Sequence, residues 1–138
     1  MCITQEYFVV KALTVVVLLS SLVSGCGTKT DTITGTFTLI DSGITRNYMG
    51  CIGTGGYRDI QAGLKVVVKS GSGRILGVSE LKPDNYSGTS RSVVCEFPFE
   101  VTDLPSSKFY SIEVGRRGSL EFSKKELEER DWKVGFKL

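Results

Sequence analysis

The stretch SVVCEFPFEV at Ser92–Val101 constrains the fold of this chain more than any other, because its apolar residues alternate strictly. Successive side chains of a β-strand point to opposite faces, so the pattern predicts a strand with one buried face. Pro98 has no N–H group, so we expect this strand to lie at a sheet edge or to leave that position unpaired. The expected buried face consists of Val93, Cys95, Phe97, Phe99 and Val101.

Strand patterns recur along the rest of the chain, usually as pairs joined by glycine-containing links. The link GSG predicts one hairpin, and RRG predicts a second. At the C-terminus Trp132, Val134, Phe136 and Leu138 alternate with polar residues and glycine, which indicates a last strand. The predicted strands, besides residues 92–101, are 33–40, 64–70, 74–81, 108–115, 119–122 and 131–138.

Within the folded domain the best helix pattern is at residues 123–130, where Ser123 and Glu126 have the spacing of a capping box. Phe122 and Leu127 are placed to form a hydrophobic staple across it. Residues 41–63 have no strand period and are expected to be a long loop with one helical turn in YRDIQAG, while residues 81–92 are rich in turn-forming residues.

These elements predict a mainly β fold, an antiparallel β-sandwich of about seven strands with one short helix. A barrel is the alternative arrangement of the same strands. At 138 residues the chain is long enough for one ordinary domain.

The N-terminal segment predicts export. Residues 12–23 are uncharged and apolar, which fits the hydrophobic region of a signal peptide and is too short to span a bilayer. The basic residue expected before this region is represented only by Lys11, so an uncleaved anchor is the alternative. We therefore expect residues 1–25 to be a signal helix, residues 26–32 a tether and residues 33–138 the folded domain.

The four residues Val23, Ser24, Gly25 and Cys26 resemble a bacterial lipobox. The resemblance implies that Cys26 is diacylated, with palmitate-type chains, and becomes the first residue of the mature protein. It also implies a lipid anchor on the extracytoplasmic face of the bacterial cell membrane. The alternative is an ordinary signal peptide that leaves Cys26 free.

Two further resemblances concern the domain. A strand, a short Glu-rich helix and a strand near the C-terminus are similar to the arrangement in transthyretin-like sandwiches, which belong with immunoglobulin-like folds in general architecture. The segments GTGGYRDI after one cysteine and FPF after another resemble uncharacterised small bacterial lipoproteins. That family implies no known activity.

The remaining cysteines of the exported part are Cys51 and Cys95, once lipidation has used Cys26. Export favours oxidation, so we expect a disulfide between them. It would close a loop of about 45 residues and contribute about 3 to 4 kcal/mol in the chain-entropy model. Two buried reduced thiols are the alternative.

The residue types exclude most catalytic schemes. The chain has no histidine, which removes the imidazole-based triads and the commonest zinc ligand sets. The carboxylate pairs Glu126 with Glu129 and Glu128 with Asp131 are better explained as a solvated helix face. A net charge of +2, evenly spread, does not favour nucleic-acid binding. No catalytic residue, metal site or cofactor is predicted.

The loop CIGTGGYRDIQAG is the candidate binding loop, because Tyr57, Arg58 and Asp59 place an aromatic ring, a cation and an anion side by side. The alternative, which the sequence favours, is structural: Arg58 and Asp59 satisfy backbone groups, and Ile60 fills the sandwich.

The predicted function is that of a lipid-anchored, non-enzymatic binding module of the bacterial cell envelope, with an envelope protein or carbohydrate as partner. The alternatives are a small secreted enzyme or inhibitor that acts on an envelope carbohydrate or peptide, and a purely structural envelope protein.

Overall fold

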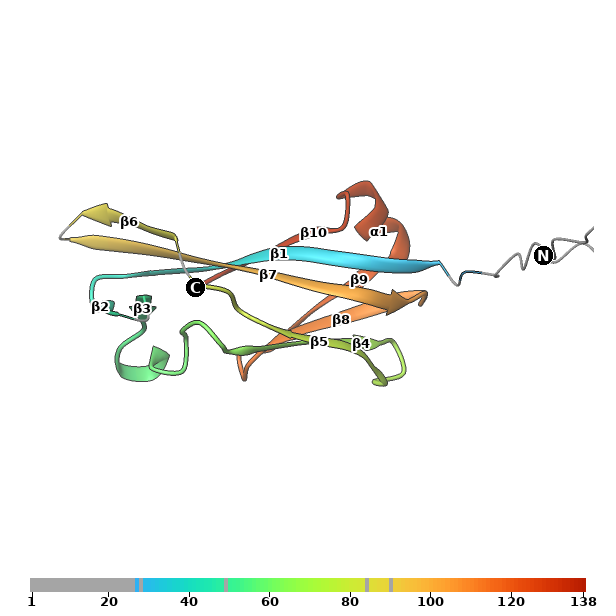
Figure 1. The fold of residues 1–138 in the computed structure, drawn as a ribbon, viewed down its shortest axis with the longest axis horizontal. Helices are drawn as coiled ribbons and strands as arrows, with labels where there is room; N and C mark the ends of the chain where they lie inside the picture. The colour runs from blue at the N-terminus through green and yellow to red at the C-terminus, as the bar shows by residue number, and fades with distance from the viewer. Residues whose placement is uncertain (1–26, 28, 49, 84, 90) are drawn as a thin grey trace, which may run out of the picture.

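The computed structural model describes residues 27, 29–48, 50–83, 85–89 and 91–138, which form two packed β-sheets and one short helix (Figure 1). This arrangement confirms the predicted mainly β fold and is consistent with a β-sandwich. The predicted signal helix and Cys26 lie outside the described residues. Among the described residues, no helix is both long enough and apolar enough to cross a membrane.

The first sheet, called here the long sheet, has the strand order β10, β1, β7 and β6. Its two central strands are the longest of the molecule and pair antiparallel along nearly their whole length. The pairing of β1 with β10 is parallel, which the prediction of an antiparallel sandwich did not include. The strands are β1 (Thr30–Asp41), β6 (Asn85–Thr89), β7 (Ser92–Pro105) and β10 (Lys133–Lys137).

The second sheet, called here the short sheet, has the order β5, β4, β8 and β9, with every pair antiparallel. Both predicted hairpins are present in it, β4 with β5 and β8 with β9. A third, separate hairpin joins two very short strands, β2 and β3. The bounds are β2 (Thr45–Asn47), β3 (Gly50–Ile52), β4 (Lys65–Ser70), β5 (Ile75–Glu80), β8 (Phe109–Val114) and β9 (Ser119–Ser123).

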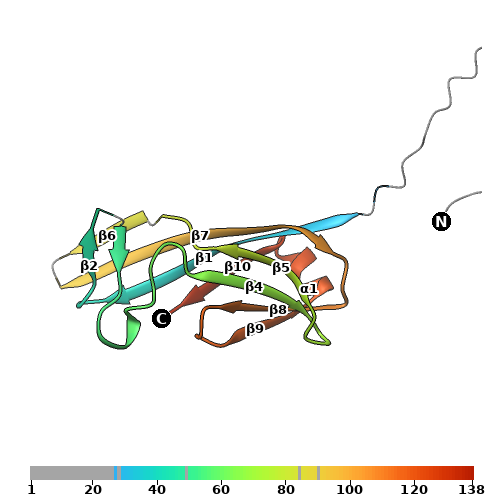
Figure 2. The same cartoon turned by 60° about the horizontal axis from the view of Figure 1, so that its bottom comes forward.

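The hydrophobic core lies between the two sheets, which form separate layers in Figure 1 and are turned by 60° in Figure 2. The alternating residues of β7 are all buried, as predicted. Facing them from the short sheet are Val66, Val68, Tyr110, Ile112 and Val114, all with 0 to 1% of their surface exposed. Gly77 of β5 allows close packing, because a side chain there would collide with Val101 and Leu104 of β7.

The described residues form ten strands rather than about seven, because β2, β3 and β6 occur where loops were predicted. All residues of β2 and β6 are exposed, so these strands lack the apolar alternation on which the prediction depended. The helical turn of the long loop is a 3₁₀ turn at Gly55–Tyr57, which overlaps the expected segment 57–63 only at Tyr57.

Pro98 is in register with Thr36 of β1 but has no strand partner on its other side, so the second of the two predicted outcomes holds on that side. β7 is a central strand, but β6 pairs only with residues 92–96 of it. The carbonyl of Pro98 accepts a hydrogen bond from the Lys82 N–H at 2.8 Å on that side. Since the N and O of one residue point to the same side of a strand, the missing N–H of Pro98 falls beyond the end of β6.

The helix α1 (Lys124–Glu129) has the predicted capping box. Glu126 N–H donates to Ser123 Oγ at 3.2 Å, and Ser123 N–H donates to Glu126 Oε2 at 2.7 Å. That backbone donor and then the Ser123 hydroxyl hold the pKa of Glu126 below its ordinary value. Leu127 is completely buried and Phe122 packs on the same core, so the helix docks on the sandwich through the staple positions.

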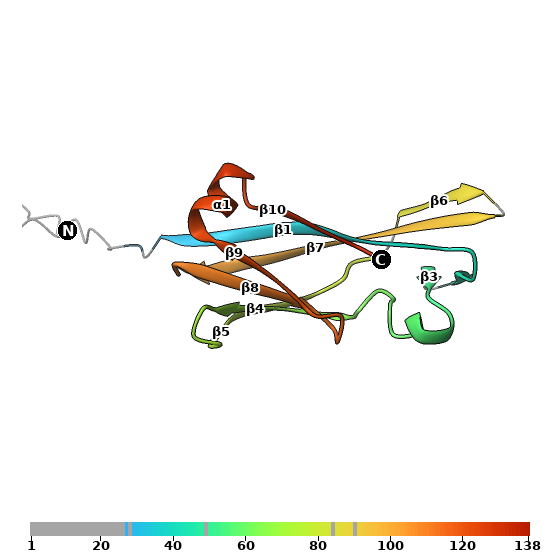
Figure 3. The same ribbon diagram turned by 180° about the vertical axis from the view of Figure 1, so that it is seen from behind.

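β1 starts at Thr30, within the expected tether, and its second residue forms a buried polar cluster. The Tyr110 hydroxyl donates to Asp31 Oδ2 at 3.1 Å, and Lys124 Nζ lies 3.5 Å from the same oxygen. Ser107 N–H donates to the Tyr110 hydroxyl at 2.9 Å. Burial is the main reason why the pKa of Tyr110 is raised. This cluster ties β1, β8 and α1 together at the end of the sandwich where β1 begins (Figure 3).

Candidate functional site

One end of the molecule is built from β2, β3, the 3₁₀ turn and β6, and we call it the tip (Figure 1). It lies at the opposite end of the long sheet from the start of β1. The tip contains the predicted binding loop at residues 51–63. β6 is part of the long sheet, and covalent and side-chain contacts hold the short β2–β3 hairpin to that sheet.

The disulfide predicted between Cys51 and Cys95 is present in the structure. It joins β3 to β7, and the two Cα atoms are 6.4 Å apart. Both cysteines are buried, with 1% and 0% of their surface exposed. The disulfide therefore fixes the β2–β3 hairpin to the long sheet, although within the described residues the hairpin pairs with no strand of either four-stranded sheet.

A cation–π contact lies next to the disulfide. The Arg46 guanidinium carbon is 4.9 Å from the centre of the Tyr86 ring. Arg46 pairs with Cys51 across the hairpin, and Tyr86 pairs with Cys95 across the long sheet. The disulfide and the cation–π contact thus lie side by side, and each connects the β2–β3 hairpin to the β6–β7 pair.

The binding loop folds back on itself. Gly53 N–H donates to the Ile60 carbonyl at 3.1 Å, and Ile60 N–H donates to the Tyr57 carbonyl at 2.9 Å. A side chain at Gly53 would collide with the backbone of Tyr57, so glycine is required for this close approach. Ile60 is completely buried in the core, as the structural interpretation of the loop predicted.

Arg117, from the turn between β8 and β9, holds the outer side of this loop. Its guanidinium forms an ion pair with Asp59 and donates to the Gly56 carbonyl at 2.6 Å. The guanidinium carbon also lies 5.2 Å from the centre of the Tyr57 ring. Asp59 is therefore used in a contact within the protein. Its partner, Arg117, is 58 residues away along the chain and was not predicted from the sequence.

The large exposed side chains of the tip are tyrosines and arginines, and smaller polar side chains lie between them. Tyr48 is 95% exposed, Tyr86 45% and Tyr57 37%. Arg58 and Arg91 are also exposed, and the described residues provide no ion-pair partner for either. Tyr57 and Arg58 were predicted from the sequence as binding residues, whereas Tyr48 and Tyr86 were not. The sequence feature that could have identified these two residues is a tyrosine next to turn-forming residues, in RNYMG and in NYSGT.

The described residues contain no group of three or more acidic, cysteine or histidine side chains placed to hold a metal ion. Two carboxylates of α1 form contacts within the helix: Glu126 completes the helix cap, and Glu129 Oε1 lies 3.8 Å from Lys125 Nζ.

No family model, curated protein or solved structure that was compared matches this chain. The fold and the tip define a small β-sandwich in which a disulfide holds a tyrosine- and arginine-bearing end. The resemblances to lipoproteins and to transthyretin-like sandwiches stay predictions from the sequence.

Proposed function

We propose that this protein is a lipid-anchored binding module of the bacterial cell envelope, which recognises its partner with the tip. The observation that carries the proposal is the placement of the exposed tyrosines and arginines at the end opposite the start of β1. The lipobox resemblance at Cys26 supplies the anchor. Several acyl chains hold a protein on a membrane stably, whereas one chain does not.

The short link between Cys26 and the fold gives the molecule an orientation. β1 starts at Thr30, so the link reaches at most about 14 Å from the lipidated residue. The sheet has a 14-residue central strand, which at about 3.3 Å per residue carries the tip roughly 45 Å farther. An anchored molecule therefore keeps the Asp31 cluster near the membrane and allows the tip to reach outward.

The side chains of the tip suit protein recognition. Tyrosine provides a large, stiff contact surface with little loss of conformational entropy, and arginine is enriched at interface positions that dominate affinity. Gly, Ser and Asn between them provide adaptable hydrogen bonds, as they do in antibody loops. The disulfide and Arg117 fix the loops before binding, which reduces the entropy lost on association.

The secreted enzyme or inhibitor and the purely structural protein remain the alternative predictions. An enzyme would need reacting groups that converge on a pocket. The tip instead presents tyrosine and arginine on loops whose one acid in the predicted motif, Asp59, is paired with Arg117. For this reason we favour binding over catalysis.

Replacing Cys26 by Ala is expected to release the protein from the membrane or to leave its signal segment uncut, because no thiol is available for acylation. The measurement is membrane fractionation with labelled palmitate and intact mass. Cys2→Ala is the matched control, since this cysteine lies in the segment to be removed, and it should change neither location nor label. Unchanged retention and mass in Cys26→Ala would refute the lipid anchor.

A photo-crosslinking amino acid at Tyr48 should capture one partner species in intact cells, because this is the most exposed of the three tyrosines of the tip. Arg58→Ser should reduce the yield several-fold by removing an exposed cation of the same surface. Arg74→Ser, an exposed arginine of the β4–β5 turn, should leave it unchanged. The same crosslinker at Lys125 of α1 gives the background. A pattern that is equal at both positions, or insensitive to Arg58→Ser, argues against recognition by the tip.

A further inference from the structure

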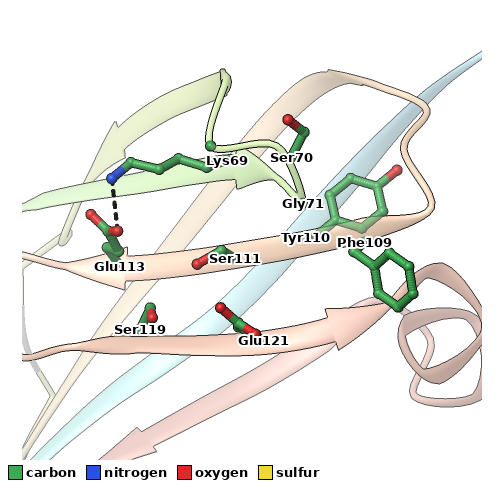
Figure 4. A pocket seen from close by; sticks show the side chains of 10 residues that line it. Lys69, Ser70, Gly71, Phe109, Tyr110, Ser111, Glu113, Ser119 and Glu121 are labelled. Atoms are coloured by element: carbon green, nitrogen blue, oxygen red, sulfur yellow. Dashed lines mark hydrogen bonds and ion pairs between the residues drawn. The ribbon is translucent and has the colours of Figure 1, made fainter.

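A groove of about 460 Å³ lies on the outer face of the short sheet, away from the tip (Figure 4). Most of its side chains belong to the residues of β4, β8 and β9 that alternate with the buried ones, and the buried Ser70 and Tyr110 and two glycines of the β4–β5 turn complete the lining. Most ligand pockets measure about 300 to 1,000 Å³, so the groove is large enough for a small molecule. It plays no part in the proposed recognition by the tip.

The strand register explains the shape of the groove. Ser111 of β8 pairs with Lys69 of β4 on one side and with Glu121 of β9 on the other. Along β8 its neighbours on the same face are Phe109 and Glu113, two residues away in each direction. A small serine thus lies between four long side chains, which makes a hollow on a sheet face that would otherwise be flat (Figure 4).

The polar groups of the groove differ in how they are used. Lys69 Nζ forms an ion pair with Glu113 Oε1 at 2.7 Å, and about a third of each side chain stays exposed. Glu121 is exposed, and the described part of the chain gives its carboxylate no ion pair. Ser111 and Ser119 add two hydroxyl groups to the lining. The groove therefore offers acceptors, a donor and hydroxyls in one row.

Phe109 provides an apolar surface at one end of the row. It lies on the outer face of β8 and is 58% exposed, whereas the next residue, Tyr110, faces the core and is almost completely buried. One edge of its side chain is close to Gly71 of the β4–β5 turn, which leaves the ring beside the groove. An exposed aromatic side chain next to polar groups binds amphiphilic molecules through its face.

We propose that this groove binds a neutral oligosaccharide. A sugar ring has an apolar C–H face, which would pack on Phe109, and a rim of hydroxyl groups, which would donate to Glu121 and accept from Lys69 and the serines. Few other ligand classes require one aromatic face and a row of mixed donors and acceptors without a dominant charge. A peptide would need several apolar side-chain pockets, and among the residues that line this groove Phe109 is the one well-exposed apolar side chain.

The test is an NMR titration of the full-length protein in a detergent that has no sugar headgroup. The probes are maltotetraose, cellotetraose and the tetramer of N-acetylglucosamine, with spermidine as a cationic comparison. We expect at least one sugar probe to shift the amide signals of Phe109, Ser111 and Glu121 at millimolar concentration. Phe109→Ala and Glu121→Gln should each weaken binding at least fivefold.

The matched control is Glu80→Gln, an exposed glutamate of edge strand β5 on the same sheet, and it should not change affinity. The amide spectrum of each variant shows whether it is folded. The proposal is overturned if no sugar probe shifts these signals, if spermidine alone does so, or if Glu80→Gln weakens binding as much as Glu121→Gln. None of these outcomes depends on whether the tip captures a partner.

Discussion

Replacing Cys51 and Cys95 together by Ala is expected to lower the free energy of unfolding by about 3 to 4 kcal/mol. The two residues are 44 positions apart, so the bond limits the unfolded chain over a long loop. Both are buried in the core, which adds a packing loss to the loss of the crosslink. The measurement is urea unfolding of the wild type and the double variant. For one domain of marginal stability this is a large fraction of the total.

The control is the same pair of unfolding curves in the presence of a reductant. Reductant should destabilise the wild type by a similar amount and leave the double variant unchanged. Equal stability of all four samples would show that the crosslink contributes nothing. The bond holds the β2–β3 hairpin in place. The double variant should therefore also lose the partner crosslinked at Tyr48 under conditions in which the rest of the sandwich is still folded.

The second large effect is expected for Phe37→Ala, which should lower the free energy of unfolding by about 3 to 5 kcal/mol. Phe37 is only 1% exposed and stacks on Phe136 with ring centres 6.0 Å apart. Phe136 in turn lies 6.2 Å from Phe99, so the three rings join β10, β1 and β7. Removing the first ring leaves a cavity at the junction and weakens the docking of β10.

Phe109→Ala is the matched control, because the same ring is removed from a side chain that is 58% exposed. Its cost should be under about 1 kcal/mol. Hydrogen exchange should also be faster at residues 133–137 in Phe37→Ala and unchanged there in Phe109→Ala. Similar costs for both variants would contradict the role of the ring cluster.

The sequence predicted the parts of the fold that bury a face. The alternation in β7 and the capping box of α1 were both found in the structure, because each is a local pattern with a direct physical cause. β2 and β6 were missed, since their residues are exposed on both faces and contact with neighbouring strands alone makes them strands. The parallel partner of β1 was missed for a related reason: nothing local in residues 133–137 indicates which strand they join.

The candidate site was predicted in part. The cysteine count gave the disulfide, and the glycine-rich loop gave Tyr57 and Arg58. Arg117 was not predicted, because it reaches Asp59 only after the β8–β9 turn is brought to the tip by the fold. The groove around Ser111 was not predicted either, because it depends on which residues of β4 and β9 lie beside it.

Because β1 pairs in parallel with β10, the long sheet cannot be completed before β10 has been synthesised. β1 receives its second neighbour only when residues 133–137 are present, roughly a hundred positions later. Until then one edge of β1 exposes its unpaired backbone groups beside the point of membrane attachment proposed for Cys26. A chain that emerges from the membrane N-terminus first therefore exposes this edge of β1 to strand addition by other chains until residues 133–137 arrive. Deleting β10 should for this reason destabilise the fold far more than the loss of five residues suggests.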